Sequence, residues 1–300
     1  MRVWIDTDVG SDVDDALTIA YVLRHPDLEL AGISTVFGDV ELRTAIAEAL
    51  LALAPGQAPP ILSGRGLPLT PERIGLMFGH EGQTILPNPE PRMRTEIEPE
   101  GPARIDKIAE ALHQTSPDVL VAIGPLTNLG ALVQHGVKLP QLAIMGGKIE
   151  DVLLEGMVPE IPEWNWYCDP LAVQTVLQAP HTELPTIVPA EVTFRTHLLP
   201  KDIEELQGGD PLAQQIGKLS ETWLEFLRSR FGRPDPRVAL HDPLTAATLV
   251  KPELCPFADV SIEVDERAAS HRQNSPANIR VATDVDNDAL REHLMETWLA

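Results

Sequence analysis

The chain has 300 residues and a formal net charge of −22 at pH 7, with 43% hydrophobic and 23% charged residues. This composition is ordinary for a globular protein and leaves enough apolar material for a large core. The negative charge argues against nucleic acid or an anionic membrane as partner, because both would be repelled, and a neutral small molecule fits better.

The cysteine content and the start of the sequence favour the cytoplasm. Cys168 and Cys255 are the two cysteines of the chain, so no disulfide framework is implied. Met1 leads straight into apolar residues without a basic or apolar signal segment. No apolar run approaches the roughly 20 residues that a membrane span requires. We therefore expect a cytoplasmic protein.

Strand and helix signals alternate over the first 180 residues. Residues 61–100, rich in proline, glycine and charge, are expected to form a long connection that carries binding residues. The alternation predicts an α/β fold with a doubly wound, mostly parallel central sheet flanked by helices. The predicted strands are residues 3–5, 28–36, 119–123, 142–145 and 186–188, and the predicted helices are residues 16–23, 41–53, 103–114, 126–134 and 170–177.

The chain from residue 200 onward is predicted to be mainly helical. We find no internal repeat and no linker long enough to separate two units, so residues 1–300 are expected to form one domain. The predicted helices are residues 201–206, 211–230, 243–250 and 286–298, and two late strands are expected near residues 260–264 and 278–282.

The most informative segment is an acidic stretch that follows the first predicted strand. Asp6, Asp8, Asp12, Asp14 and Asp15 fall within ten residues, where a strand ends and a helix begins. In open α/β sheets this edge is where ligands bind. Carboxylates so close together repel one another unless a cation or protons neutralise them, and an all-oxygen set suits Ca²⁺ or Mg²⁺. A loop that merely caps the helix would account for one or two of these side chains.

Two later segments also place polar residues at predicted helix starts. In the Gly-Pro-Leu-Thr-Asn turn of residues 124–128, Thr127 or Asn128 is expected to cap the next helix. Farther along, Asp242 precedes a proline and is expected to be another helix N-cap. Its neighbour His241 is a candidate proton donor beside an acidic metal cluster.

Residues 162–170 combine polar and aromatic side chains. Glu163 and Asn165 alternate with large aromatic residues, an arrangement that can hydrogen-bond hydroxyl groups while presenting an apolar wall. At the end of the segment, Asp169 followed by Pro170 is expected to form the N-cap and first residue of a helix.

These segments together resemble the inosine–uridine-preferring nucleoside hydrolase family, in residues and in order. The match spans essentially the whole chain. It implies a nucleoside hydrolase-like fold with a helical C-terminal region, hydrolysis of ribonucleosides to free base and ribose, a role in nucleotide salvage, and a homodimer or homotetramer. The matching elements are residues 6–10 with 14–16, 124–128, 145–147, 163–165 with 169–170, and 241–243.

The resemblance also implies a mechanism. It implies a calcium ion held by Asp8, Asp15, Asp242 and the main-chain carbonyl of Ile123. A water bound to calcium would be the nucleophile, with Asp8 as its general base. His241 would protonate the departing base, as in family members that have a histidine there.

The same resemblance suggests the residues that bind the substrate. Asp14, Glu163 and Asn165 would hold ribose hydroxyls, and His80 would flank the sugar or the base. Asp39 stands where many members have asparagine, so it is expected to add a negative charge beside the sugar.

The sequence departs from the family pattern at two points. The spacing from Asp8 to Asp14 is two residues longer than in the simplest pattern, so Asp12 could replace or supplement Asp14 or Asp15. In addition, Met157 stands about where a hydroxyl-binding asparagine is common, which bears on contacts at the ribose 5′ end.

Two alternatives stay open at this stage. Residues 6–10 also resemble the Asp-x-Asp motif of haloacid dehalogenase-type phosphatases, for which Lys148 would be the later lysine. The other alternative is a non-catalytic member that binds a ribosyl ligand in the same pocket. Base preference should depend on a variable wall, for which the candidates are Phe78, His80, Trp223 and Phe226, although helical spacing of the last two is also typical of a core stripe.

Overall fold

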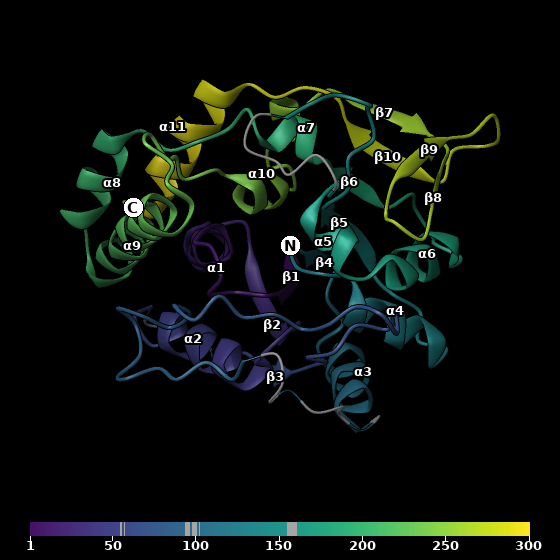
Figure 1. The fold of residues 1–300 in the computed structure, drawn as a ribbon, viewed down its shortest axis with the longest axis horizontal. Helices are drawn as coiled ribbons and strands as arrows, with labels where there is room; N and C mark the ends of the chain where they lie inside the picture. Colours follow the sequence, from purple (N-terminus) through teal and green to yellow (C-terminus); the bar gives the residue numbers. More distant parts are fainter. Residues whose placement is uncertain (55, 57, 94–96, 98–100, 102, 155–160) are drawn as a thin grey trace.

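The structure is a computed structural model, which describes residues 1–54, 56, 58–93, 97, 101, 103–154 and 161–300. Eight strands form a central sheet in the order β3-β2-β1-β4-β5-β6-β10-β7 (Figure 1). Neighbouring strands are parallel except β10 and β7, which are antiparallel. These strands are β1 (Arg2–Thr7), β2 (Glu29–Thr35), β3 (Ile61–Ser63), β4 (Val119–Ala122), β5 (Gln141–Met145), β6 (Thr186–Val188), β7 (Phe257–Val260) and β10 (Ile279–Ala282).

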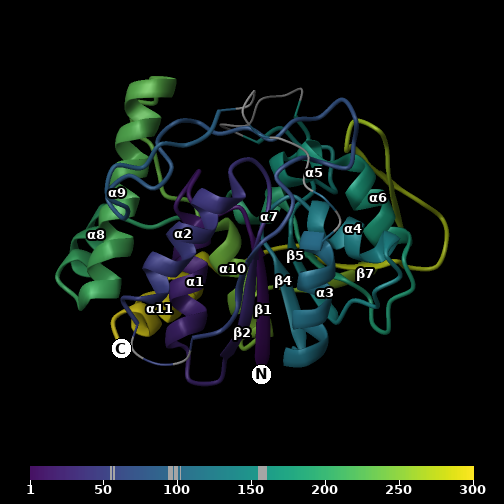
Figure 2. The same ribbon diagram turned by 90° about the horizontal axis from the view of Figure 1, so that it is seen from below.

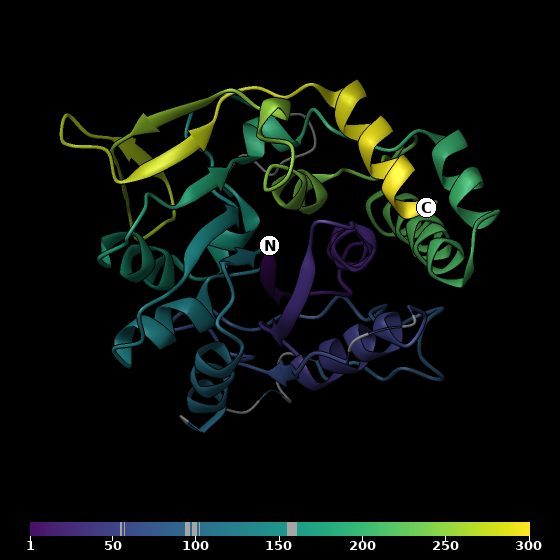
Figure 3. The ribbon, with the colours of Figure 1, turned by 180° about the vertical axis from the view of Figure 1, so that it is seen from behind.

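Helices cover both faces of this sheet, as Figures 1 and 3 show. The first face carries α1 (Asp14–Arg24), α2 (Val40–Leu51), α8 (Pro200–Gln207), α9 (Pro211–Phe231), α10 (His241–Ala247) and α11 (Asn287–Trp298). The second face carries α3 (Ala103–Thr115), α4 (Thr127–Gln134) and α6 (Pro170–Gln178). The predicted doubly wound α/β fold is confirmed.

The alternation of side chains along the strands divides the core in two. Successive side chains of a strand point to opposite faces of the sheet. In β1, Val3 and Ile5 pack into the core under α1, whereas Trp4 packs into the core under α4. Because both faces are covered, β1 reads as an unbroken apolar run rather than an alternating one.

The predicted strands and helices occur in the predicted order, and the structure adds short elements that were not predicted. The strand expected near 260–264 is two strands: β7 ends at Val260, and β8 (Ile262–Val264) pairs with β9 (Ser270–Arg272) in a separate two-stranded sheet. The short elements β3, α5 (Trp164–Cys168), α7 (Ala190–Thr193) and the 3₁₀ helix η2 (Pro252–Leu254) carry too few residues to show a period in sequence.

The strand order creates a crevice between the carboxyl ends of β1 and β4. The helices that follow them, α1 and α4, cover opposite faces, so the chain diverges at this point. Figure 2 shows the long connection after β3 and one end of α9 on this side of the sheet. Among the described residues, no helix is both long enough and apolar enough to span a bilayer.

Candidate active site

A pocket of about 400 Å³ opens at the carboxyl edge of the sheet. Segments far apart in the sequence converge on it, and most of its charged groups are acidic. Its lining consists of Asp8, Ser11, Asp12, Asp14, Asp15, Phe78, Ile123, Met145, Ile161, Glu163, Trp164, Asn165, Phe194, Trp223, Phe231, Arg233, His241 and Asp242.

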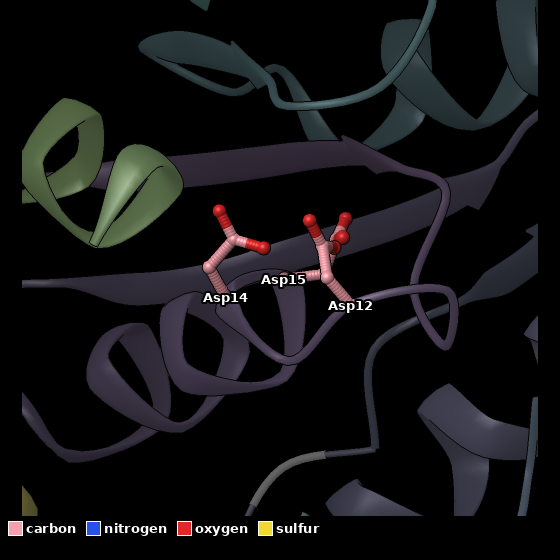
Figure 4. A group of neighbouring side chains, drawn as sticks. All are labelled: Asp12, Asp14 and Asp15. Carbon is pink, nitrogen blue, oxygen red and sulfur yellow. The ribbon is translucent and has the colours of Figure 1, made fainter. Parts of the chain in front are cut away.

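The acidic loop between β1 and α1 supplies the floor of the pocket. Asp12, Asp14 and Asp15 each offer one carboxylate oxygen, and these oxygens lie within 4.8 Å of one another (Figure 4). Asp15 also accepts a hydrogen bond from the Thr7 hydroxyl. The Oδ1 atom of Asp14 is buried and has no hydrogen-bond partner among the described residues. Asp12, whose part the sequence left open, therefore belongs to the cluster.

The electrostatics of this loop and of Asp242 favour a bound cation. Burial raises the pKa of Asp8 to about 7, although the Arg43 guanidinium opposes this and Asp12 reinforces it. Burial, and then the neighbouring carboxylates, raise the pKa values of Asp14 and Asp242 well above the ordinary value. Asp15 behaves in the same way. A bound cation would stabilise all of these groups in their ionised form.

A buried arginine that the sequence analysis did not identify holds the acidic loop from below. Arg43 of α2 is fully buried, and its guanidinium donates to the main-chain carbonyls of Asp8, Val9 and Phe37. Its Nη2 atom donates to the Ser11 hydroxyl at 3.0 Å and lies 3.8 Å from Asp8 Oδ2. One sequence signal was available, because Arg43 shares the apolar face of the predicted helix at residues 41–53.

The Gly-Pro-Leu-Thr-Asn turn supports the pocket through tertiary bonds instead of capping a helix. The N-cap of α4 is Leu126, without a side-chain cap, so the expected capping by Thr127 or Asn128 is wrong. Thr127 donates to Asp169 Oδ2 at 2.7 Å, and Asn128 donates to Asp6 Oδ2 at 2.9 Å. Both side chains bond buried carboxylates. Leaving a buried carboxylate without donors costs more free energy than a helix cap contributes.

Asp6 is part of this support rather than of the pocket lining. Burial raises the pKa of Asp6 to about 7, while hydrogen bonds from Ser34 and Asn128 lower it. By contrast, the predicted N-cap role of Asp169 before Pro170 is confirmed, because Asp169 Oδ1 accepts from Ala172 N at 3.2 Å.

Glu163 and Asn165, predicted to bind ribose hydroxyls, line the pocket together. Glu163 is the N-cap of α5 and accepts main-chain hydrogen bonds from Asn165, Trp166 and Gly147 at 2.7, 2.9 and 2.8 Å. Burial raises the pKa of Glu163, and these bonds oppose the rise. Asn165 donates through Nδ2 to the Ile123 carbonyl at 3.0 Å. These bonds fix Asn165 against the end of β4 and Glu163 against the segment that follows β5.

His241 and Asp242 enter the pocket from the first turn of α10. The helix begins at His241 and its N-cap is Leu240, so the expected N-cap role of Asp242 is wrong, and its buried carboxylate faces the pocket instead. His241 Nδ1 lies 2.7 Å from the Thr193 hydroxyl of α7. Burial lowers the pKa of His241 to about 4, an effect that Asp12 opposes.

The structure differs from expectation at His80. Phe78, two residues earlier, lines the pocket, whereas His80 is not among the lining residues. The cause is Glu81, whose buried carboxylate accepts from Phe78 N at 2.6 Å and Gly79 N at 2.8 Å. This turn directs His80 to the main-chain carbonyl of Ser11 instead.

Asp39 also lies elsewhere than expected. It caps α2 by accepting from Leu42 N at 3.2 Å, and Arg92 bonds it through Nη2 at 2.6 Å and through its main-chain N at 2.9 Å. Burial opposes ionisation, but the hydrogen bonds from Arg92 outweigh it and hold the pKa of Asp39 below its ordinary value. The expected negative charge beside the sugar is therefore neutralised by Arg92, and Asp39 is not among the pocket-lining residues.

Met157 lies outside the described residues. Lys148, which the phosphatase alternative requires, donates to the Val152 carbonyl at 2.9 Å and does not line the pocket. The phosphatase alternative thus lacks its lysine.

The donor set in the pocket fits a hard divalent cation. All the candidate ligand atoms are carboxylate or carbonyl oxygens, the type that Ca²⁺ and Mg²⁺ prefer. Asp14 Oδ1 has no hydrogen-bond partner among the described residues, and the pKa values of Asp14, Asp15 and Asp242 are raised. Both observations indicate that the described residues do not neutralise the negative charge of the cluster. All four expected ligands line this pocket: Asp8, Asp15, Asp242 and Ile123.

Comparisons with known proteins agree with this arrangement. A family model described as inosine-uridine preferring nucleoside hydrolase matches residues 3–292. The pyrimidine-specific ribonucleoside hydrolase RihA of Klebsiella pneumoniae is 27% identical over 317 residues, which cover 99% of this chain and 97% of that protein. The solved structure of a plant nucleoside hydrolase, PpNRh1, has a TM-score of 0.78 at 27% identity and covers 100% of this chain and 99% of that chain. A purine-preferring ribonucleoside hydrolase from Gardnerella vaginalis shares the fold, with a TM-score of 0.80 at 21% identity and coverage of 99% and 98%.

Proposed function

The chain belongs to the inosine-uridine preferring nucleoside hydrolase family and hydrolyses the N-glycosidic bond of ribonucleosides, and from this premise we propose how its own residues carry out the reaction. The observation that carries the proposal is that five aspartates share one pocket with Glu163 and Asn165; the aspartates are Asp8, Asp12, Asp14, Asp15 and Asp242. The family is metal-dependent, and the aspartate cluster could bind a metal.

We propose that the metal is calcium, held by Asp8, Asp15, Asp242 and the Ile123 carbonyl, with Asp12 as a further ligand. Support comes from the oxygen-only donor set and from the cluster of carboxylate oxygens. When bound, the ion would lower the pKa of the attacking water and help to orient it. Arg43 contributes by keeping the loop in place, because its guanidinium donates hydrogen bonds to Asp8, Val9, Ser11 and Phe37.

Asp8 is the proposed general base. Asp8 accepts a proton from water as the water oxygen attacks the anomeric carbon, and the bond from that carbon to the nucleobase nitrogen breaks. The electron pair of the broken bond goes to the nucleobase. The ribosyl group acquires oxocarbenium character, as in other glycoside hydrolyses. Base assistance of this kind typically contributes about 10²- to 10⁴-fold in rate.

Asp14, Glu163 and Asn165 are proposed to hold the ribose hydroxyls. Asp14 has an unpartnered acceptor in the pocket, and Glu163 and Asn165 are already oriented by main-chain bonds. Binding energy from the hydroxyls can be used to distort the sugar towards the transition state. The surrounding carboxylates also favour a positively charged sugar ring.

His241 is the proposed proton donor to the departing base. Burial alone disfavours the charged imidazole, but the negative charge that develops on the base favours it. The Thr193 hydroxyl bonds the ring at Nδ1 and leaves Nε2 for the ligand. We therefore propose that protonation by His241 accelerates the reaction most for nucleobases that are poor leaving groups.

The aromatic part of the pocket is the proposed binding surface for the nucleobase. The RihA relative is named pyrimidine-specific, and the aromatic part of this pocket consists of Phe78, Trp164, Phe194, Trp223 and Phe231. Aromatic side chains accept either ring size by stacking.

The test is release of ribose from a panel of purine and pyrimidine ribonucleosides, with and without prior chelation of calcium. Release that stops on chelation and returns with added calcium is expected, and the panel identifies the preferred base. Release that is unaffected by chelation would reject the metal assignment. Absence of release from any nucleoside, with calcium bound, would instead favour the non-catalytic ribosyl-binding alternative.

We also propose that residues 1–300 form one domain, that the enzyme is a homodimer or homotetramer, and that it acts in the cytoplasm. The first rests on the eight-stranded sheet that joins both halves of the chain, and the others on the family resemblance and the sequence. Light scattering coupled to size-exclusion chromatography measures the oligomeric state directly.

A further inference from the structure

His80 lies between two parts of the active site without lining the pocket. Its Nε2 atom lies 2.6 Å from the main-chain carbonyl of Ser11, in the acidic loop. Because a carbonyl only accepts, Nε2 must carry the hydrogen. The other ring nitrogen, Nδ1, is buried without a hydrogen-bond partner among the described residues. The polar contact of this ring with the described residues is thus a single bond to Ser11.

The faces of the same ring contact helix α9. The centroid of Phe226 lies 3.9 Å from that of His80 at an interplanar angle of 26°, and the centroid of Trp223 lies 5.9 Å away at 20°. Trp223 and Phe226 are themselves stacked, with centroids 5.6 Å apart. Contacts of this geometry are favourable beyond the area that they bury.

Two of the residues that His80 contacts, Ser11 and Trp223, line the pocket. Ser11 is followed by Asp12, a member of the aspartate cluster, and both line the pocket. Trp223 lines the pocket as part of its aromatic wall, whereas Phe226 does not. A small cavity of about 30 Å³ between them is lined by Ser11, Asp12, His80 and Trp223 among others.

We propose that His80 is a positioning residue with two separable tasks: its Nε2–H holds the acidic loop through Ser11, and its ring holds the Trp223 wall of the substrate pocket. The proposal rests on the proposed function for its kinetic consequences, but not for its structural ones. It replaces the expected role of His80 as a residue that touches the substrate.

Two substitutions separate the tasks. His80→Gln keeps an N–H at the same number of bonds from the backbone as Nε2, but it removes the aromatic ring. His80→Phe keeps a ring for stacking but removes the donor. Phe226→Leu removes the stack from the α9 side and should therefore reproduce His80→Gln.

The first readout needs neither metal nor substrate. Hydrogen exchange is expected to become faster in a peptide covering residues 9–13 in His80→Phe but not in His80→Gln. A peptide covering residues 220–230 should show the opposite pattern. Thermal unfolding of both variants checks that they fold. If His80→Gln does not fold, Phe226→Leu still tests the second task, the contact of the ring with the Trp223 wall.

The second readout is functional and divides in the same way. In His80→Phe we expect calcium affinity, measured by titration calorimetry, to weaken by about threefold to tenfold, the size of one hydrogen bond. In His80→Gln we expect calcium affinity close to wild type and KM for the preferred nucleoside raised by about threefold to tenfold, with kcat less affected.

A matched control comes from the opposite edge of the sheet. His181 also places Nε2 2.7 Å from a main-chain carbonyl, that of Val176, and lines a different hollow. His181→Phe should leave exchange at residues 9–13, calcium affinity and KM unchanged.

Equal effects of both His80 variants on both peptides, or no effect on either, would overturn the proposal. If the wild-type protein released no ribose, the proposed function would be rejected but the role of His80 would not. The exchange patterns would still report on its contacts with Ser11 and with α9.

Discussion

The two ends of α1 place buried titratable groups in opposite situations. At the first turn, Asp14 and Asp15 have strongly raised pKa values, chiefly from burial, and Asp14 keeps an unpartnered oxygen. At the last turns, Tyr21 bonds His293 of α11, with the hydroxyl 2.7 Å from Nε2. His25 completes a cluster of three rings, with centroids 5.3 and 5.5 Å from those of Tyr21 and His293.

The difference teaches what marks a functional site in this protein. Acidic groups at a helix N-terminus are favoured by the helix dipole, so the position of Asp14 is not unusual. What distinguishes Asp14 is a carboxylate oxygen without a hydrogen-bond partner among the described residues. At the other end, Tyr21 bonds His293, and His25 accepts a hydrogen bond from Asp27 N. Burial occurs at both ends and does not separate them.

Cavity size does not separate the two edges of the sheet either. The amino edge has a hollow of about 640 Å³, larger than the 400 Å³ pocket of the active site. Its lining includes His113, Asp118, Lys138, His181 and Glu183, which do not form a group of three or more acidic, histidine or cysteine ligands within reach of one ion among the described residues.

The comparison predicts the largest effect at the acidic end. Asp8→Asn should lower kcat for nucleoside hydrolysis by about 10²- to 10⁴-fold while leaving substrate binding nearly intact, because an amide does not accept the proton from water. Asp118→Asn, at the amino edge, serves as the control. Steady-state ribose release measures both, and full activity of Asp8→Asn would reject the general-base assignment.

The next effect concerns the leaving group. His241→Ala should slow a natural nucleoside by about 10²-fold or more, but p-nitrophenyl riboside much less, because its leaving group needs no proton. The ratio of kcat/KM for the two substrates is the measurement. Equal losses on both substrates would remove His241 from the acid role.

Metal affinity should depend on the acidic end alone. Asp242→Ala should weaken calcium binding by about tenfold or more, since it removes a charged ligand. Glu183→Gln, in the hollow at the amino edge, removes a charge without touching the pocket and should leave affinity unchanged. Titration calorimetry decides, and an equal loss in both variants would indicate a general effect of net charge.

Calcium should also stabilise the fold from the same end. At a calcium concentration 100 times Kd, binding to the folded state contributes about 2.7 kcal/mol to the free energy of unfolding. Thermal unfolding with and without calcium should show this gain in the wild type and in His293→Gln. In Asp242→Ala, a tenfold loss of affinity should reduce the gain to about 1.4 kcal/mol at the same concentration, and a larger loss should reduce it further. An undiminished gain in Asp242→Ala would place the ion elsewhere.

The smallest effect is expected at the ring cluster. Burial, followed by Lys251, lowers the pKa of His293 below its ordinary value of 6.5, and burial likewise lowers that of His25. The unfolded chain therefore binds more protons than the folded one as the pH falls below about 6.5, so stability decreases on acidification. Urea unfolding at pH 7.5 and 5.5 should show a smaller decrease for His293→Gln than for the wild type. An identical decrease would exclude His293 as a contributor.

Local patterns in the sequence determined the framework of the protein. The apolar runs and helical periods predicted the parallel sheet, and Asp169 before Pro170 predicted its helix start correctly. The aspartates after the first strand predicted the position of the pocket, because parallel strands end at a common edge. These features depend on neighbours within a few residues.

Tertiary structure decided which partner each polar group found. Asp39 pairs with Arg92, His80 turns to Ser11, and Asp242 lies inside a helix rather than at its cap. Arg43 reaches the acidic loop from more than 30 residues away. Each of these outcomes balances desolvation against the bonds available after the chain has packed, and that balance depends on long-range approaches that no short pattern encodes.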